Sequence, residues 1–101
     1  MTSESRESED MTCFFCGHKA SVRLEGHGNL CDITCKEGGC GGRYVVAINA
    51  VAGLKERLQG GYESRIHAGY REWVNRLNRE GKILFIHISK LGYTEMEIPL
   101  D

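Results

Sequence analysis

The chain has 101 residues and a mass of 11.3 kDa, which is the size of one ordinary domain and excludes a second independent one. Hydrophobic residues make up 41% of the chain and charged residues 27%, and no run of about 18 apolar residues occurs, so we expect a protein with no membrane partner. The formal net charge of -1 argues against a surface built entirely for nucleic acid.

Composition divides the chain into three segments. Residues 1–10 carry four acidic side chains and one Arg, and we expect them to form a disordered acidic tail because they have almost nothing apolar to bury. Residues 11–47 contain all five cysteines and are rich in glycine, which is typical of a loop-rich metal-binding segment. Residues 48–101 are expected to form a helical and β extension that packs with the preceding segment as one compact unit.

The metal-binding segment contains a strand pattern. Residues 20–24 alternate between apolar and polar side chains, residues 26–29 supply turn chemistry, and residues 30–35 resume an extended pattern. This order predicts a β-hairpin. Residues 43–46 are β-branched and aromatic and predict a third strand.

The second half of the chain predicts two helices followed by strands. Residues 47–59 place Ile48, Val51, Leu54 and Leu58 at helical spacing, and a longer helix is predicted over 62–80, ending at Gly81. Residues 83–89 read as a buried strand and 93–98 as a last edge strand. The apolar stripe of the longer helix consists of Ile66, Tyr70, Trp73, Val74 and Leu77.

An odd number of cysteines, without a basic and then apolar leader at the start of the chain, favours thiolate metal ligation in a reducing compartment over a disulfide framework. We therefore expect a cytoplasmic protein. Two residues separate Cys13 from Cys16 in a tight turn, and Gly17 is free to take a positive φ there. This arrangement is half of a tetrahedral zinc site.

The second half of the site must come from two of the three remaining cysteines. We favour Cys35 and Cys40, because Gly41 and Gly42 follow Cys40 as Gly17 follows Cys16. Cys31 is the alternative ligand and is otherwise a small buried residue of the strand. The predicted cofactor is one structural Zn²⁺ per chain, although iron suits the same four sulfurs. His18 and His27 are weaker candidates for ligands.

The paired cysteine turns and the hairpin between them resemble the zinc-ribbon class. Within that class the chain is most similar to small prokaryotic ribbons, in which Gly, a Tyr-containing strand and an Ala/Leu helix follow the last Cys, here over residues 40–54. The resemblance covers residues 13 to 58, with four residues instead of two inside the second turn. Together with the helices and strands predicted above, it gives an α+β fold with an N-terminal zinc ribbon and β-hairpin, two helices and a C-terminal strand or hairpin. It also implies a module that binds nucleic acid or docks on a larger protein machine.

Nothing in the sequence predicts an enzyme or a small-molecule substrate. Four thiolates close a zinc site, whereas a catalytic zinc keeps one coordination position open. The His-x-Glu and Pro-Cys-x-x-Cys segments of zinc deaminases do not occur, and neither does a phosphate-binding Gly-rich loop. His67 and His87 are single histidines for which a structural role is expected.

A cluster of arginines is the candidate partner-binding surface. At about 100° per residue, Arg65, Arg76 and Arg79 fall on the side of the 62–80 helix opposite its apolar stripe. Such a cluster binds carboxylates of a protein or phosphates of a nucleic acid. The acidic tail and the net acidity favour a protein partner, and we expect an adaptor or inhibitor that docks on a larger prokaryotic or phage machine. A nucleic-acid-binding ribbon is the alternative, and a solvated surface without a partner is the simplest interpretation.

Overall fold

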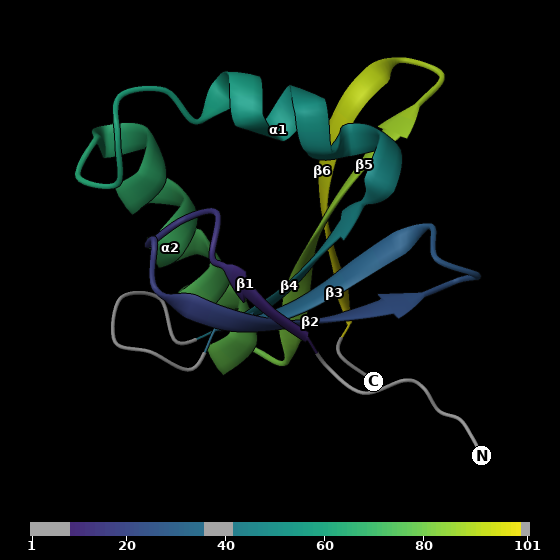
Figure 1. Ribbon diagram of the computed structural model, residues 1–101, viewed down its shortest axis with the longest axis horizontal. Helices are drawn as coiled ribbons and strands as arrows, with labels where there is room; N and C mark the ends of the chain where they lie inside the picture. Colours follow the sequence, from purple (N-terminus) through teal and green to yellow (C-terminus); the bar gives the residue numbers. More distant parts are fainter. Residues whose placement is uncertain (1–8, 36–41, 100–101) are drawn as a thin grey trace.

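The computed structural model describes residues 9–35 and 42–99 and shows a mixed α+β protein (Figure 1). One six-stranded sheet contains every strand, and the strands cross it in the order in which they occur in the chain. The strands are β1 (Glu9–Thr12), β2 (Lys19–Glu25), β3 (Leu30–Cys35), β4 (Arg43–Ala47), β5 (Lys82–Ser89) and β6 (Gly92–Pro99). Between β4 and β5 lie the 3₁₀ turn η1 (Ile48–Ala50) and the helices α1 (Val51–Arg57) and α2 (Arg65–Arg79).

The sheet joins the two halves of the chain. Strands β1 to β4 pair in antiparallel fashion, β4 pairs with β5 in parallel, and β5 and β6 form an antiparallel hairpin. Parallel neighbours require a crossover connection, which α1 and α2 supply here. The predicted hairpin, the third strand and both C-terminal strands are confirmed. No helix in the described part of the chain is long and apolar enough to cross a membrane.

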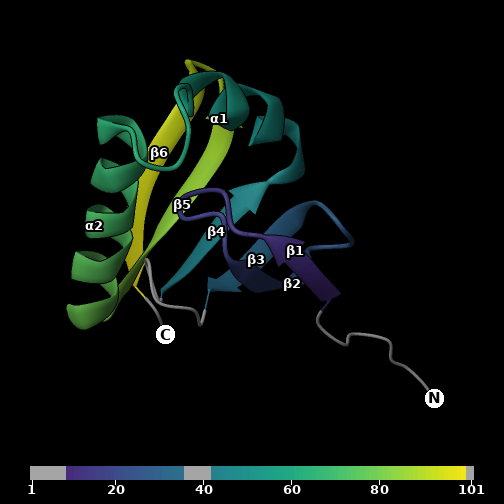
Figure 2. The ribbon, with the colours of Figure 1, turned by 60° about the vertical axis from the view of Figure 1, so that its left-hand side comes forward.

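Both helices lie over one face of the sheet (Figure 2). The register aligns Ile33 with Tyr44 and Tyr44 with Leu84, so that apolar side chains from three central strands share that face. Leu54 of α1 and Leu77 of α2 belong to the same buried cluster. The turn between β1 and β2 contributes to this cluster too, and the core is therefore continuous across both halves of the chain.

The first predicted helix is shorter than expected. Instead of one helix over 47–59, η1 precedes an α1 of seven residues, after which Leu58 leaves the helical conformation with φ -89° and ψ 73°. Ile48 is 48% exposed and does not contribute to the core as its spacing predicted. The reason is local, because the 3₁₀ turn rotates Ile48 away from the face on which Leu54 is buried.

The longer helix begins three residues later than predicted and buries a different side chain in its first turn. Ser64 caps α2, since its Oγ accepts a hydrogen bond from the backbone N–H of His67. Ile66 is 46% exposed whereas His67 is 3% exposed, so the prediction that Ile66 lies on the buried stripe is wrong. The contact between His67 and the Ser64 cap sets this orientation. Gly81 ends the helix at φ 79° as expected.

Polar side chains fix α2 to the sheet at its C-terminal end and near its middle. The Asn78 amide accepts from the Arg43 backbone N–H at 2.7 Å and donates to the carbonyls of Arg43 and Lys82 at 3.2 and 3.0 Å. Toward the middle of the helix, Tyr70 donates its hydroxyl to Glu95 of β6. Burial and this carboxylate raise the pKa of Tyr70 to about 12, so the phenol remains a hydrogen-bond donor at neutral pH.

The predicted acidic tail over residues 1–10 includes two residues that belong to the sheet. Glu9 and Asp10 belong to β1, where they pair with Val22 and Ser21 of β2. Their backbone groups complete the ladder, and the Asp10 carboxylate lies 3.2 Å from the ammonium of Lys19. The rest of that segment, residues 1–8, lies outside the described residues.

Candidate metal centre

The turn between β1 and β2 directs backbone amides toward a cysteine sulfur. Cys13 donates its N–H to the His18 carbonyl at 2.8 Å, and Gly17 donates to the Cys13 carbonyl at 3.1 Å. These two bonds close the turn. Phe15 then donates its N–H to Cys13 Sγ at 3.4 Å, which is the contact that stabilises a thiolate in a zinc-binding turn.

Three cysteines from two separate segments meet at this turn. The Sγ atoms of Cys13, Cys16 and Cys35 lie within 4.8 Å of one another, with Cys16 and Cys35 at 3.4 Å. Four sulfurs at about 2.3 Å from a tetrahedral zinc are separated by about 3.8 Å, so the three positions fit three corners of such a site. The four described cysteines form no disulfide with one another, since this bond requires about 2.05 Å.

Burial makes this cluster unfavourable for thiolates unless a cation is bound. Cys13 and Cys35 are 0% and 1% exposed, and Cys16 is half-buried. Burial, with smaller contributions from Cys35 and Cys13, raises the pKa of the Cys16 thiol to about 11 against the lowering effect of the His18 backbone. A bound divalent metal would supply the missing positive charge and release the thiol protons, because a coordinated thiol is deprotonated.

The other candidate ligands differ in position. Cys31 is not a member of the three-cysteine group and lies on the same strand as Cys35 but four residues away, or about 13 Å. Within residues 9–35 and 42–99 no histidine joins the group; His18 is exposed and His27 lies in the turn at the far end of the β2–β3 hairpin. Cys40 lies outside the described residues.

Tyr44 of β4 supports the centre through a contact that the sequence did not reveal. Its hydroxyl lies 3.3 Å from Cys13 Sγ and accepts the Phe14 backbone N–H at 3.2 Å. Tyr44 is fully buried, so the phenol serves as a polar contact inside the core. A Tyr in a strand pattern is usually read as an apolar residue, and only the register of β3 and β4 places this one beneath the turn.

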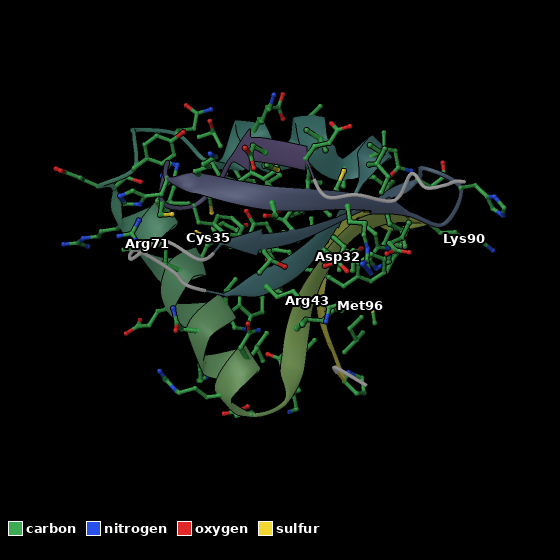
Figure 3. The ribbon with its side chains drawn as sticks, turned by 60° about the horizontal axis from the view of Figure 1, so that its bottom comes forward. Asp32, Cys35, Arg43, Arg71, Lys90 and Met96 are labelled. Carbon is green, nitrogen blue, oxygen red and sulfur yellow. The ribbon has the colours of Figure 1, made fainter. Side chains whose placement is uncertain are left out.

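Arg71 is a second contact that sequence analysis missed. Its Nη1 donates to the carbonyls of Phe15 and Tyr62, each at 2.8 Å, and so links the cysteine turn to the segment before α2. Figure 3 shows Arg71 and Cys35 at the same end of the molecule. The helical pattern places Arg71 beside the buried stripe and one turn after His67, which is the only signal of this role in the sequence.

Gly17 gives a testable prediction at the turn. It has φ +80°, and a Cβ added there meets the Tyr62 ring at 2.7 Å. We expect Gly17→Ala to lower the free energy of unfolding by about 2 kcal/mol, because strain and crowding act together. Gly28→Ala is the matched control, since Gly28 has φ +86° and nothing within 4 Å, and it is expected to cost about 1 kcal/mol. Equal losses in urea titrations of the two variants would show that the Tyr62 contact is unimportant.

The three candidate partner-binding arginines lie on the outer side of α2, where all are exposed. Arg76 lies 3.8 Å from Glu97 of β6, whose carboxylate also accepts from Trp73 Nε1 at 3.0 Å. No ion pair of Arg65 or Arg79 occurs among the described residues. The arginines are about 20° to 60° apart around the helix, so they form one surface, the arginine face (Arg65, Arg76 and Arg79).

The donor set is the clearest chemical feature of this centre. Three thiols in one buried cluster suit soft or borderline metals such as zinc or iron and do not suit magnesium or calcium, which take oxygen ligands.

No protein family, curated protein or solved structure matches this chain.

Proposed function

We propose that the chain is a non-enzymatic zinc-binding interaction module of the zinc-ribbon class. One structural Zn²⁺ is held by Cys13, Cys16, Cys35 and Cys40, and the module docks as an adaptor or inhibitor on a larger cytoplasmic protein machine of a prokaryote or phage. The observation that carries the metal assignment is the buried cluster of three sulfurs within 4.8 Å. The resemblance of residues 13 to 58 to small prokaryotic ribbons supports the class.

Cys40 is proposed as the fourth ligand from chain connectivity. The Cys35 N–H donates to the Gly42 carbonyl at 2.8 Å, so the chain leaves the sheet and returns to it at adjacent backbone positions. Cys40 precedes Gly42 by two residues, which an extended chain spans in at most about 7 Å. It is thus the remaining cysteine with the shortest tether to the cluster.

A zinc with four thiolate ligands has a structural role in this proposal. Zinc supplies charge compensation for the crowded sulfurs, and four ligands leave no position for a substrate or a water. The chain's own groups then hold the turn in place: the Phe15 amide donates to Cys13 Sγ, the Tyr44 hydroxyl lies against the same sulfur, and Arg71 binds the turn carbonyl. Zinc binding and folding of this half are therefore one equilibrium.

The partner-binding surface in this proposal is the arginine face. Guanidinium groups pair with carboxylates in bidentate geometry, which gives orientation as well as attraction. Arg65 and Arg79 are exposed and make no ion pair with described residues. A partner can therefore bind these two side chains without breaking an ion pair in the described part of the chain. A protein with acidic side chains is the preferred partner, and a nucleic acid is the alternative that the same charges allow.

Charge reversal of the whole face tests the partner proposal. We expect the triple variant Arg65→Glu, Arg76→Glu and Arg79→Glu to keep its zinc and its melting temperature, because exposed charges contribute little to stability. It is expected to lose association with the partner by repulsion. The measurement is affinity capture from a native-host lysate, with and without nuclease, followed by binding assays on the isolated partner.

The control reverses the same number of charges elsewhere, at Arg23, Lys82 and Lys90, which are exposed residues on other elements. This variant is expected to bind normally, since it has the same net charge but an intact arginine face. If the partner is duplex DNA, log affinity falls with log salt with a slope of about 3, which corresponds to three phosphates contacted. Equal binding by both triple variants would contradict the assignment of this face.

A further inference from the structure

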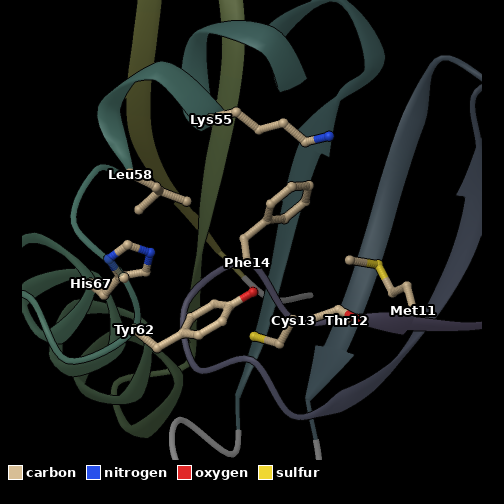
Figure 4. Close-up of a pocket in the computed structure, with 9 residues that line it drawn as sticks. Met11, Thr12, Cys13, Phe14, Lys55, Leu58, Tyr62 and His67 are labelled. Atoms are coloured by element: carbon tan, nitrogen blue, oxygen red, sulfur yellow. The ribbon is translucent and has the colours of Figure 1, made fainter.

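A pocket of about 550 Å³ opens beside the cysteine turn (Figure 4). Its wall is formed by the turn on one side and by the end of α1 and the segment before α2 on the other. The volume falls within the range of about 300 to 1,000 Å³ that is usual for small-molecule sites. Its apolar surface comes from Met11, Phe14 and Leu58, and its polar groups come from Lys55, Tyr62 and His67.

His67 is the buried polar group of this pocket. The side chain is 3% exposed, and its Nδ1 lies 2.8 Å from Ser64 Oγ. Across residues 9–35 and 42–99, no hydrogen bond to its Nε2 occurs; the ring has only an edge-on contact with Tyr62 at 5.3 Å. A buried ring nitrogen without a partner is costly, which points to a group that enters the pocket and bonds to it.

The hydrogen bonds of Ser64 indicate which proton His67 carries. Ser64 Oγ already accepts the His67 backbone N–H at 3.3 Å, so its own proton is available for Nδ1. In that arrangement Ser64 Oγ and His67 Nδ1 are both satisfied, and the ring proton resides on Nε2, the one ring nitrogen without a described partner. Burial and the nearby Arg71 charge lower the pKa of His67, so the ring is a neutral donor at pH 7.

The charge around the pocket is positive. None of the nine residues that line it is acidic, and Lys55 contributes an ammonium group. In the described part of the chain, Lys55 has no ion pair. Figure 4 shows its side chain extended past the Phe14 ring. A ligand with an apolar body and one negative charge therefore matches both the wall and the charge.

We propose that this pocket binds a small monocarboxylate with a compact apolar body, such as an arylacetate. The ring packs against Phe14, Leu58 and Met11, one carboxylate oxygen accepts the proton of His67 Nε2, and Lys55 compensates the charge. The pocket borders the three-cysteine group, since Cys13 is one of its lining residues, but the residues proposed to bind the ligand are not members of that group. It goes beyond the proposed docking function, and neither depends on the other.

The probe is phenylacetate, titrated into the zinc-loaded full-length protein and followed by ¹⁵N NMR. We expect saturable shifts at Phe14, Leu58 and His67 with a Kd of about 1 mM or tighter, which lies within the range for a ligand of ten non-hydrogen atoms. The neutral isostere phenylacetamide is expected to bind at least tenfold more weakly. Equal affinity for the acid and the amide would overturn the proposal, and so would failure of phenylacetate to saturate the folded protein.

Two pairs of variants locate the carboxylate. Lys55→Met keeps the aliphatic chain and is expected to weaken phenylacetate at least fivefold, whereas Lys90→Met, at a distant exposed position, is expected to have no effect. His67→Gln places a side-chain amide near the position of Nε2, whereas His67→Asn places one near Nδ1, where it contacts only Ser64. The Gln variant is therefore expected to bind phenylacetate more tightly than the Asn variant. Should the His67 variants fail to fold, the Lys55 and Lys90 pair decides alone. Equal affinity in that pair would contradict the proposal.

Discussion

Cys35→Ser is expected to abolish stoichiometric zinc binding and to unfold the chain. In small zinc modules the metal contributes about 10 to 16 kcal/mol of apparent binding free energy, which exceeds the net stability of most domains of this size. Cys35 is also 1% exposed and belongs to the core cluster, so the loss of the metal leaves the buried Cys13 thiol and the half-buried Cys16 thiol without a compensating cation. Metal analysis of the purified protein, together with circular dichroism at 25 °C, measures both effects.

Cys31→Ser is the matched control, because it makes the same chemical change on the same strand. Cys31 lies outside the sulfur cluster, and we expect this variant to retain one zinc and its fold. Burial raises the pKa of the Cys31 thiol, in agreement with a partly buried side chain that stays protonated. The reverse outcome, in which Cys31→Ser loses zinc and Cys35→Ser keeps it, would show that the third ligand has been assigned to the wrong cysteine.

Phe15→Ala is expected to cost about 3 to 5 kcal/mol in the free energy of unfolding. The ring is fully buried between the cysteine turn and α2, with ring centroids 4.8 Å from Tyr70 in a stacked arrangement and 4.6 Å from Tyr44. Its removal leaves a cavity at the point where the two halves of the core meet. Zinc affinity is expected to fall with stability, because the same turn supplies Cys13 and Cys16.

Phe14→Ala is the control for this prediction. Phe14 is the neighbouring residue of the same type, but it is only half-buried, and its deletion is expected to cost less than half as much. Urea unfolding of both variants in the presence of zinc, with competition by a chelator, gives stability and metal affinity separately. Equal losses at the two positions would contradict a core that is continuous through Phe15.

Local patterns predicted most of the strands. The alternation over 20–24 and 30–35 gave the β2–β3 hairpin because one face of it is buried, and the β-branched residues of β4 and β5 have the composition of central strands. Strand β1 was missed, since Glu9–Thr12 is short and contains only one large apolar residue, Met11, so it shows no strand alternation. The parallel pairing of β4 with β5 was missed for a different reason, because no local signal encodes which strands meet across a crossover.

The sequence predicted that cysteines form the candidate metal centre, but it did not predict the residues that surround them. The spacing of Cys13 and Cys16 indicated half of a metal site, and the structure brings Cys35 to it. Cys31 and Cys35 share one face of β3 because they are four residues apart, so strand periodicity alone does not distinguish them. The contacts of Tyr44 and Arg71 depend on packing between distant segments, which a single sequence does not display.

The most direct test of the four-thiolate zinc centre is zinc-edge X-ray absorption on the purified, metal-quantified protein. The proposal predicts one zinc per chain with four sulfur neighbours at about 2.3 Å and no nitrogen or oxygen neighbour. A folded chain without metal would contradict the centre altogether. Three sulfurs with one water oxygen at about 2.0 Å would contradict the closed site and with it the non-enzymatic function, whereas three sulfurs with one histidine nitrogen would contradict only the four-thiolate ligand set.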